Sequence, residues 1–205
     1  MGTWISESKT HVATMDGNDF FANERSKTIA KSSVGAARIE FVGVNGDRKI
    51  LKADISLGEG DVIDATMMNK KALLDFLEVQ IKDAKDQDVL FSVHLKATMM
   101  KVSDPIIFGH VVSVFFKEIV DKHGKTLKET GIDLNNGMGQ LLEKLELLPS
   151  DKKQQIGKDI EDCIKEQPAL YMVNSDKGVT NLDVPSDVII AVSYTHLRAH
   201  ETRHD

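Results

Sequence analysis

The sequence predicts an α/β fold, because three kinds of pattern follow one another along the chain. A stretch of alternating apolar and charged residues contains an Asn45-Gly46 turn, a later stretch has apolar residues at helical spacing, and a buried strand pattern lies between two predicted helices. Helices that alternate with strands are typical of sheets with at least one parallel pair. The chain has 205 residues, of which 41% are apolar and 28% charged, enough for one medium-sized domain.

The composition excludes several classes of protein. A net charge of -6 and the lack of a Lys/Arg cluster argue against a nucleic-acid partner. The single cysteine, Cys163, cannot form an internal disulfide, so a reducing compartment is expected. The first twenty residues lack a secretory signal pattern, and no apolar stretch has membrane-spanning length. These features predict a cytoplasmic protein with no membrane partner.

The first regular pattern is a predicted β-hairpin. Apolar and charged residues alternate in "RIEF" (38–41), which is typical of a strand. Asn45-Gly46 is a favoured hairpin turn, and "RKILKADISL" (48–57) reads as the returning strand.

A helix and then a buried strand are predicted next. In residues 66–87, Asn69 is a favoured cap. Four apolar residues then recur at helical spacing: Leu73, Leu77, Ile81 and Ala84. "DVLFSVHLKAT" (88–98) predicts a strand with two faces. One face holds Val89, Phe91, Val93 and Leu95, and the other holds Leu90, Ser92, His94 and Lys96.

Three more helices and a strand complete the predicted order. A single helix is expected from Asp104, its cap, with Pro105 at the first helical position and Gly124 just past the end. Further helices are predicted within "QLLEKLELL" and from a Ser150 cap, and a strand within "ALYMVNSDKG" runs into a polar loop. "VPSDVII" reads as the first turn of another helix.

Ligands in open α/β sheets collect at the carboxyl ends of strands, which singles out two stretches, 92–105 and 173–187. Lys96 stands at the end of the first strand, where desolvation would lower its pKa and suit it to proton transfer or to a Schiff base. The alternative is a lysine that extends to solvent at a strand terminus.

The other candidates have simpler interpretations. His94 and His110 are expected to be hydrogen-bonded core histidines, and Met99 and Met100 packing residues. Asp104 and Asp187 are expected helix caps, and the Lys177-Gly178 pair is a weak phosphate signal. The sequence has no glycine-rich nucleotide-binding motif. Three residues at four-residue spacing could hold Zn²⁺ on a helix: His196, His200 and His204.

Long blocks of this sequence resemble the monomeric type of NADP-dependent isocitrate dehydrogenase. The blocks are "SVHLKATMMKVSDPIIFGHVV", "SKTHVATMDGNDFFANE" and "ALYMVNSDKGVTNLDVPSDVI", and the likeness runs from Gly2 to about Ile190. The resemblance implies part of that family's large domain, a β-hairpin plus incomplete Rossmann-like βα units. It also implies oxidation of isocitrate by NADP and decarboxylation to 2-oxoglutarate, a step of the tricarboxylic acid cycle, with Mg²⁺ or Mn²⁺ as Lewis acid. The family's catalytic lysine falls in "HLKAT" and maps onto Lys96, a proton-transfer group. Lys101, the nearest competitor, is expected to be structural.

The family is several times longer than this chain. Its substrate-binding segment maps upstream, and its catalytic tyrosine, metal ligands and NADP-binding residues map downstream, so no cofactor or metal residue is assigned here. Asp183 stands where the family usually has histidine. We therefore expect residues 1–191 to be a partial, monomeric-type large domain that is inactive alone. Its apolar surface is expected to be uncovered at Ile106, Phe108, Phe115 and Phe116. The alternatives are a non-catalytic α/β fragment without a specific ligand and an aldolase-like enzyme that uses Lys96 as a Schiff-base amine.

The last residues, 192–205, resemble a translated sequencing adapter, so we expect a non-native, disordered tail. The spacing of its three histidines would then be an accident of reading frame.

Overall fold

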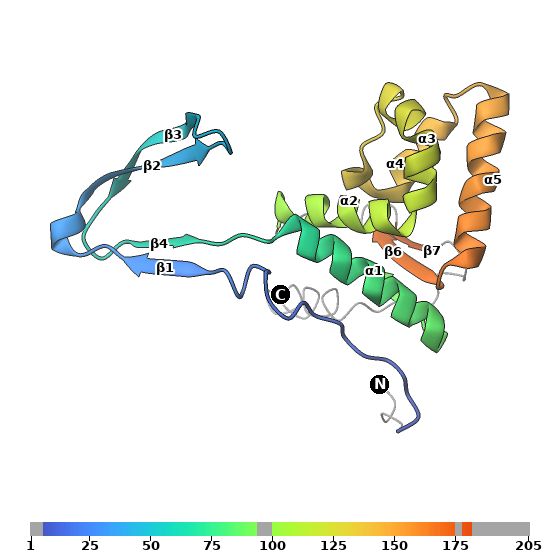
Figure 1. The fold of residues 1–205 in the computed structure, drawn as a ribbon, viewed down its shortest axis with the longest axis horizontal. Coiled ribbons are helices and arrows are strands. Elements are labelled where there is room, and N and C mark those ends of the chain that lie inside the picture. The colour runs from blue at the N-terminus through green and yellow to red at the C-terminus, as the bar shows by residue number, and fades with distance from the viewer. Residues whose placement is uncertain (1–5, 94–99, 175–177, 182–205) are drawn as a thin grey trace, which may run out of the picture. The chain divides into compact units, whose positions relative to one another are not determined.

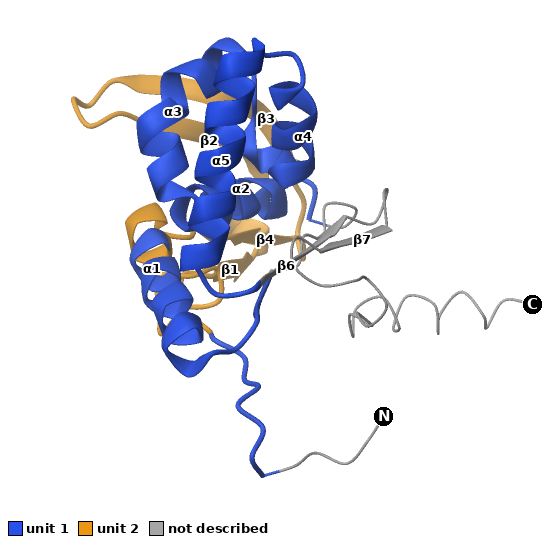
Figure 2. Ribbon diagram, turned by 90° about the vertical axis from the view of Figure 1, so that its right-hand side faces the viewer, with its two compact units in different colours: residues 1–13, 74–205 blue, residues 14–73 orange. Residues whose placement is uncertain are grey.

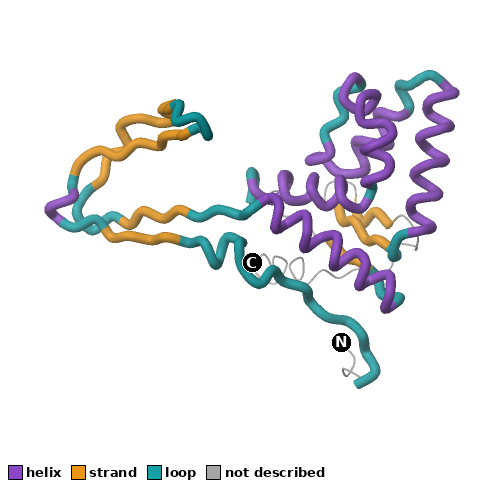
Figure 3. The backbone as a smooth tube through the Cα atoms, viewed as in Figure 1, coloured by secondary structure: helices purple, strands orange, loops and turns teal. Residues whose placement is uncertain are grey.

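The computed structural model describes residues 6–93, 100–174 and 178–181. The chain divides into two compact units, which are coloured separately in Figure 2. Unit 1 comprises Met1–Ala13 and Leu74–Asp205, and unit 2 comprises Thr14–Leu73. Helices dominate unit 1 and strands dominate unit 2 (Figure 3).

Unit 2 consists of two antiparallel ribbons (Figure 1). Strand β2 (Gly35–Val42) pairs with β3 (Arg48–Leu57), and the Gly43 N–H donates to the Asp47 carbonyl across the turn at 2.7 Å. Gly46 has φ +85°, a conformation that glycine adopts without strain. The predicted hairpin is confirmed.

The second ribbon pairs β1 (Arg25–Thr28) with β4 (Val62–Ala65), and a short 3₁₀ turn, η1 (Lys31–Ser33), follows β1. These two strands were not predicted, because each has only four residues, all exposed, which is too few to show a buried face. Helix α1 (Lys70–Gln87) begins in unit 2 and continues in unit 1. The Asn69 side chain accepts the Ala72 N–H at 3.0 Å, which confirms the predicted cap. All four residues of the predicted apolar stripe are buried.

The predicted long helix is two helices, α2 (Ser103–Phe115) and α3 (Lys117–Glu129). The backbone turns at Phe116 (φ -105°, ψ 37°), and Phe115 and Phe116 are both almost fully buried. Neighbouring residues on a straight helix point about 100° apart, so the turn allows both rings to enter one core. Gly124 therefore lies inside α3, contrary to the prediction.

Two predicted helix caps were also wrong. Val102 occupies the cap position of α2, so Asp104 lies in the first turn and Pro105 is the third helical residue. Pro149 precedes α5 (Ser150–Glu166), and Ser150 is the first helical residue. Between α3 and α5 lie η2 (Leu134–Asn136) and α4 (Gly137–Leu145).

A three-stranded sheet in unit 1 contains β5 (Phe91–Val93), β6 (Leu170–Asn174) and β7 (Gly178–Asn181), in that order. The β5–β6 pair is parallel, as predicted, and β6–β7 is antiparallel. Residues 178–181 are therefore a strand rather than the predicted polar loop. The predicted helix at 184–190 lies outside the described residues.

The core of unit 1 is formed by apolar side chains from its helices. Phe91 of β5 stacks on Phe115, with ring centroids 6.4 Å apart. The expected uncovered surface was wrong for Phe108, Phe115 and Phe116, which are buried in this core; Ile106 alone of the four is exposed, at 45%. None of the helices in the described residues has the length and apolar character needed to cross a membrane.

Candidate functional site

The candidate site lies where β5 and β6 end at the same edge of the sheet. The strands are parallel, and Val93 is in register with Met172. Of the two stretches chosen from the sequence, the first leaves the sheet after Val93, and the second contains the end of β6 and all of β7. This edge is the ordinary ligand position in an α/β sheet. The second stretch turns back at once into β7, whereas the first continues to α2.

Lys96 lies outside the described residues, as do His94 and Met99. The structure describes the elements on either side of the lysine. Strand β5 ends at Val93, three residues before it, and α2 begins at Ser103, seven residues after it. The described elements before and after the Lys96 segment are thus a strand and a helix, in the predicted order, but the strand predicted over 88–98 is described only for Phe91–Val93.

Close packing against η2 fixes the position of α2. A Cβ on Gly109 would stand 3.0 Å from the Asn135 backbone nitrogen and 3.1 Å from its Cα, so only glycine fits without a backbone shift. Gly137 adopts φ +75°, and a Cβ there would stand 2.9 Å from the Phe108 ring. These two glycines allow the helix that follows the Lys96 segment to sit close to the η2 backbone.

The buried thiol of Cys163 contacts the C-terminal end of α2. Its Sγ donates to the Phe115 carbonyl at 3.6 Å. Burial raises the pKa of the Cys163 thiol, and the negative charges of Glu118 and Glu166 raise it further. The thiol is therefore protonated at neutral pH, which makes it a poor nucleophile or metal ligand.

The remaining candidates are scattered. Met100 is 48% exposed, so its prediction as a packing residue was wrong. Lys101 is exposed, and His110 is partly buried on α2. Five candidates lie outside the described residues: Lys177, Asp187, His196, His200 and His204. Asp183 also lies outside them.

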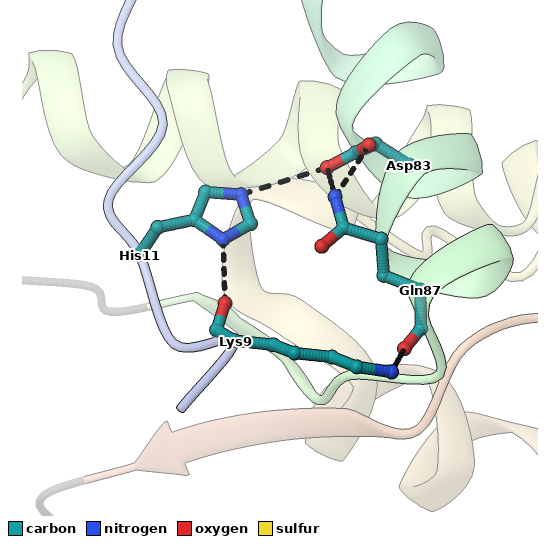
Figure 4. Close-up of polar contacts among 4 residues, drawn as sticks. All are labelled: Lys9, His11, Asp83 and Gln87. Carbon is teal, nitrogen blue, oxygen red and sulfur yellow. Dashed lines mark hydrogen bonds and ion pairs between the residues drawn. The ribbon is translucent and has the colours of Figure 1, made fainter. Parts of the chain in front are cut away.

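A polar anchor that was not predicted joins the N-terminal segment to the last turns of α1 (Figure 4). Lys9 Nζ donates to the Gln87 carbonyl at 2.8 Å. His11 Nδ1 lies 2.8 Å from the Lys9 carbonyl, and its Nε2 lies 3.5 Å from Asp83. The Gln87 amide donates to both Asp83 oxygens at 2.8 Å. The anchor fixes the segment against the helix that leads into β5, and no regular spacing in the sequence indicates it.

A cleft of about 370 Å³ lies between α1, α2, α3 and α5. Ile81, Phe115 and Cys163 contribute to its wall, together with Lys82 and Lys117. A hydrogen bond to Asp86 raises the pKa of Lys82, and one to Glu78, at 3.0 Å, raises that of Lys117. Both ammonium groups are therefore already paired, and a third lysine, Lys85, also lines the cleft.

The described residues contain no group of three or more His, Cys, Asp or Glu side chains that could hold a metal ion. On their own, the described residues therefore do not make up a complete Mg²⁺ or Mn²⁺ site.

Comparison with known proteins gives consistent matches along almost the whole chain. The family model described as monomeric isocitrate dehydrogenase matches residues 1–202. Similar proteins include isocitrate dehydrogenase [NADP] of Azotobacter vinelandii, 49% identical, isocitrate dehydrogenase [NADP] 2 of Colwellia maris, 48% identical, and isocitrate dehydrogenase [NADP] 2 of Mycobacterium tuberculosis, 44% identical. Each match extends over 193 residues, 94% of this chain and 26% of the relative. The chain thus spans about a quarter of the length of the curated relatives it matches.

Proposed function

Because this chain belongs to the monomeric isocitrate dehydrogenase family, we propose that it supplies one catalytic group, Lys96, to an enzyme that oxidises isocitrate with NADP. The product is 2-oxoglutarate, formed with release of CO₂ in the tricarboxylic acid cycle. The observation that carries the proposal is the parallel β5–β6 pair, whose carboxyl edge leads directly into the Lys96 segment. The high identity to proteins named isocitrate dehydrogenase [NADP] supports the substrate and the cofactor.

The proposed role of Lys96 is proton transfer. Oxidation of the substrate alcohol moves a hydride from carbon to the nicotinamide ring, so the hydroxyl proton must leave with it. A neutral lysine amine at the carboxyl end of a strand can accept that proton, and its ammonium form can return a proton to the carbon of the enolate left after CO₂ departs. Desolvation at such an edge favours the neutral amine that this role needs.

NADP and Mg²⁺ or Mn²⁺ are proposed to bind to other parts of the enzyme. NADP would accept the hydride, and the metal ion would polarise the substrate oxygens. We further propose a monomeric, cytoplasmic enzyme without a nucleic-acid partner. The buried, unpaired Cys163 supports a reducing compartment.

The 205-residue chain is proposed to be inactive alone, because it spans about a quarter of the relatives' length. Isocitrate-dependent formation of NADPH by the purified chain would contradict this.

A hybrid enzyme tests the role of Lys96. Residues 2–190 of this chain replace the matching segment of the Azotobacter vinelandii relative, and NADPH formation is followed with isocitrate and Mn²⁺. Lys96→Met is expected to lower kcat by about 10²–10⁴-fold, the usual contribution of general acid–base catalysis. Lys101→Met, five residues away and exposed, is the matched control and is expected to keep most of the activity. Equal effects of the two substitutions would remove Lys96 from the mechanism. Trapping of a keto acid on Lys96 by borohydride would favour Schiff-base chemistry instead.

We also propose that Val192–Asp205 is not native sequence, on the resemblance to a translated adapter, although the match to the family model extends to residue 202. The test is the nucleotide record, in which adapter codons should begin near Val192. Different codons there would refute the proposal.

A further inference from the structure

Unit 2 has almost no core of its own. Within Thr14–Leu73, the buried apolar residues are Ile29 and Leu73. The β2–β3 hairpin carries five large apolar side chains that are exposed: Ile39, Phe41, Val42, Ile50 and Leu51. A two-stranded hairpin is only marginally stable in water without a surface to pack on. The hairpin sequence therefore indicates a layer that covers it.

The two faces of the hairpin differ in their ion pairs, although the face that holds Glu40 also carries the exposed side chains of Val42 and Ile50. On one face, the Glu40 carboxylate lies 3.5 Å from Arg38 and 3.3 Å from Arg48, which gives this face its own ion pairs. The side chains that alternate with them along β2, Ile39 and Phe41, point to the opposite face. They are 50% and 57% exposed.

A β-bulge enlarges the apolar face. Ile39 is in register with Lys52 and Glu40 with Ile50, so Leu51 is the extra residue of β3. In such a bulge two residues oppose one across the ribbon, here Leu51 and Lys52 opposite Ile39. Leu51 is 60% exposed. We call Ile39, Phe41 and Leu51 the hairpin apolar face.

Two lysines border this face. Lys49 is in register with Phe41, and Lys52 with Ile39. Within the described ranges, no hydrogen bond or ion pair is found for either ammonium group. A complementary surface would therefore be apolar at its centre and carry carboxylates at its rim.

We propose that the hairpin apolar face docks on another part of the same isocitrate dehydrogenase polypeptide, a surface with an apolar centre and an acidic rim. This proposal rests on the proposed function. The relatives have nearly three quarters of their length outside the matched segment, which leaves ample polypeptide to form the covering surface. A partner on the same chain also has a high effective concentration, so a face of this modest size suffices for docking.

Hydrogen exchange on two proteins tests the docking: the 205-residue chain and the hybrid with the Azotobacter vinelandii relative. Amides of β2 and β3 are expected to exchange at least about tenfold more slowly in the hybrid, because docking suppresses local opening. Phe41→Asp in the hybrid should return this exchange toward that of the isolated chain. Val44→Asp, at the fully exposed hairpin tip, is the matched control and should leave exchange unchanged. If Phe41→Asp prevents folding, the milder Lys52→Glu replaces it. This substitution puts a negative charge opposite the proposed acidic rim, so it is expected to accelerate hydrogen exchange in the hairpin.

Three results would overturn the proposal. Equal hairpin exchange in both proteins would show that nothing in the rest of the enzyme covers the face. Slow exchange in the isolated monomer would assign the cover to this chain itself, and slow exchange only at high concentration would assign it to a second copy. NADPH formation by the hybrid is measured separately, so that the two proposals can fail independently. An active hybrid with an unprotected hairpin would reject the docking proposal alone. An inactive hybrid with a protected hairpin would reject the catalytic proposal alone.

Discussion

The two units contain similar kinds of apolar residue but differ in what covers them. Apart from Ile29 and Leu73, every buried apolar residue found in the described ranges belongs to unit 1. Its helices cover one another, and Phe115 and Phe116 lie with ring centroids 4.9 Å apart in the common core. The ribbons of unit 2 have no second layer within their own unit.

The difference teaches that periodicity alone does not create a core. A helical stripe such as that of α1 becomes buried only where other helices or strands pack on it, and unit 1 supplies them. An alternating strand pattern needs an opposing layer in the same way, and residues 14–73 supply only two-stranded ribbons. Stability in the isolated chain should therefore depend on unit 1.

The largest effect is expected from truncation in the core of unit 1. Phe115→Ala should lower the free energy of unfolding by about 3–5 kcal/mol, because it removes a fully buried ring that stacks on Phe91. Urea denaturation followed by helical circular dichroism measures this change. The matched control is Phe41→Ala, at a ring 57% exposed in unit 2, which should change the same quantity by less than about 0.5 kcal/mol.

If Phe41→Ala destabilises the isolated chain as much as Phe115→Ala does, the proposed difference in core packing between the two units is wrong. That result would mean that the hairpin is already part of the cooperative core. A small effect in the isolated chain and a large one in the hybrid would sharpen the contrast.

A glycine pair gives the next largest effect. Gly109→Ala should destabilise unit 1 by about 1–3 kcal/mol, because its Cβ would stand 3.0–3.1 Å from the Asn135 backbone in η2. Gly124→Ala, inside α3 with no atom within 4 Å of the new Cβ, should instead stabilise by about 0.5–1 kcal/mol. Thermal unfolding of the two variants should shift Tm in opposite directions. If both variants lost stability, helix propensity and the room for a Cβ atom would not explain the effect of alanine at these two glycines.

Much of the fold could be predicted from local patterns. The turn at Asn45-Gly46 and the cap at Asn69 depend on neighbouring residues alone, and both were correct. The break at Phe116 and the fit of Gly109 against η2 depend on contacts between segments distant in sequence, so no local pattern shows them. Gly124 was misread for the same reason: glycine often follows a helix end, but packing extends α3 past it.

The site was less predictable than the fold. The sequence pattern around a lysine at a strand end is the same whether the lysine is catalytic or extends to solvent. Only the resemblance to a family favours the catalytic role for Lys96. The parallel β5–β6 pair was predicted from the order of elements and is confirmed. The Lys9–Gln87 and His11–Asp83 anchor joins residues more than seventy positions apart, and their polar side chains have no periodic signature.

The smallest effect is expected from a charged contact between α3 and α5. Hydrogen bonds from Lys122, at 2.7 Å, and then from His123, at 2.6 Å, hold the pKa of Asp159 below its ordinary value of 3.8. A lowered carboxylate pKa stabilises the folded state above the ordinary pKa, and this stabilisation is lost as the pH falls through the lowered value. Asp159→Asn should therefore lower stability by about 1 kcal/mol or less at pH 7, and the difference in Tm from the unsubstituted chain should shrink below about pH 4. Asp162→Asn is the matched control, because Asp162 pairs with Lys165 on its own helix and joins no second element, so its effect on Tm at pH 7 should be smaller still. A loss at Asp159 as large as that at Phe115 would mean that charge, rather than apolar burial, holds unit 1 together.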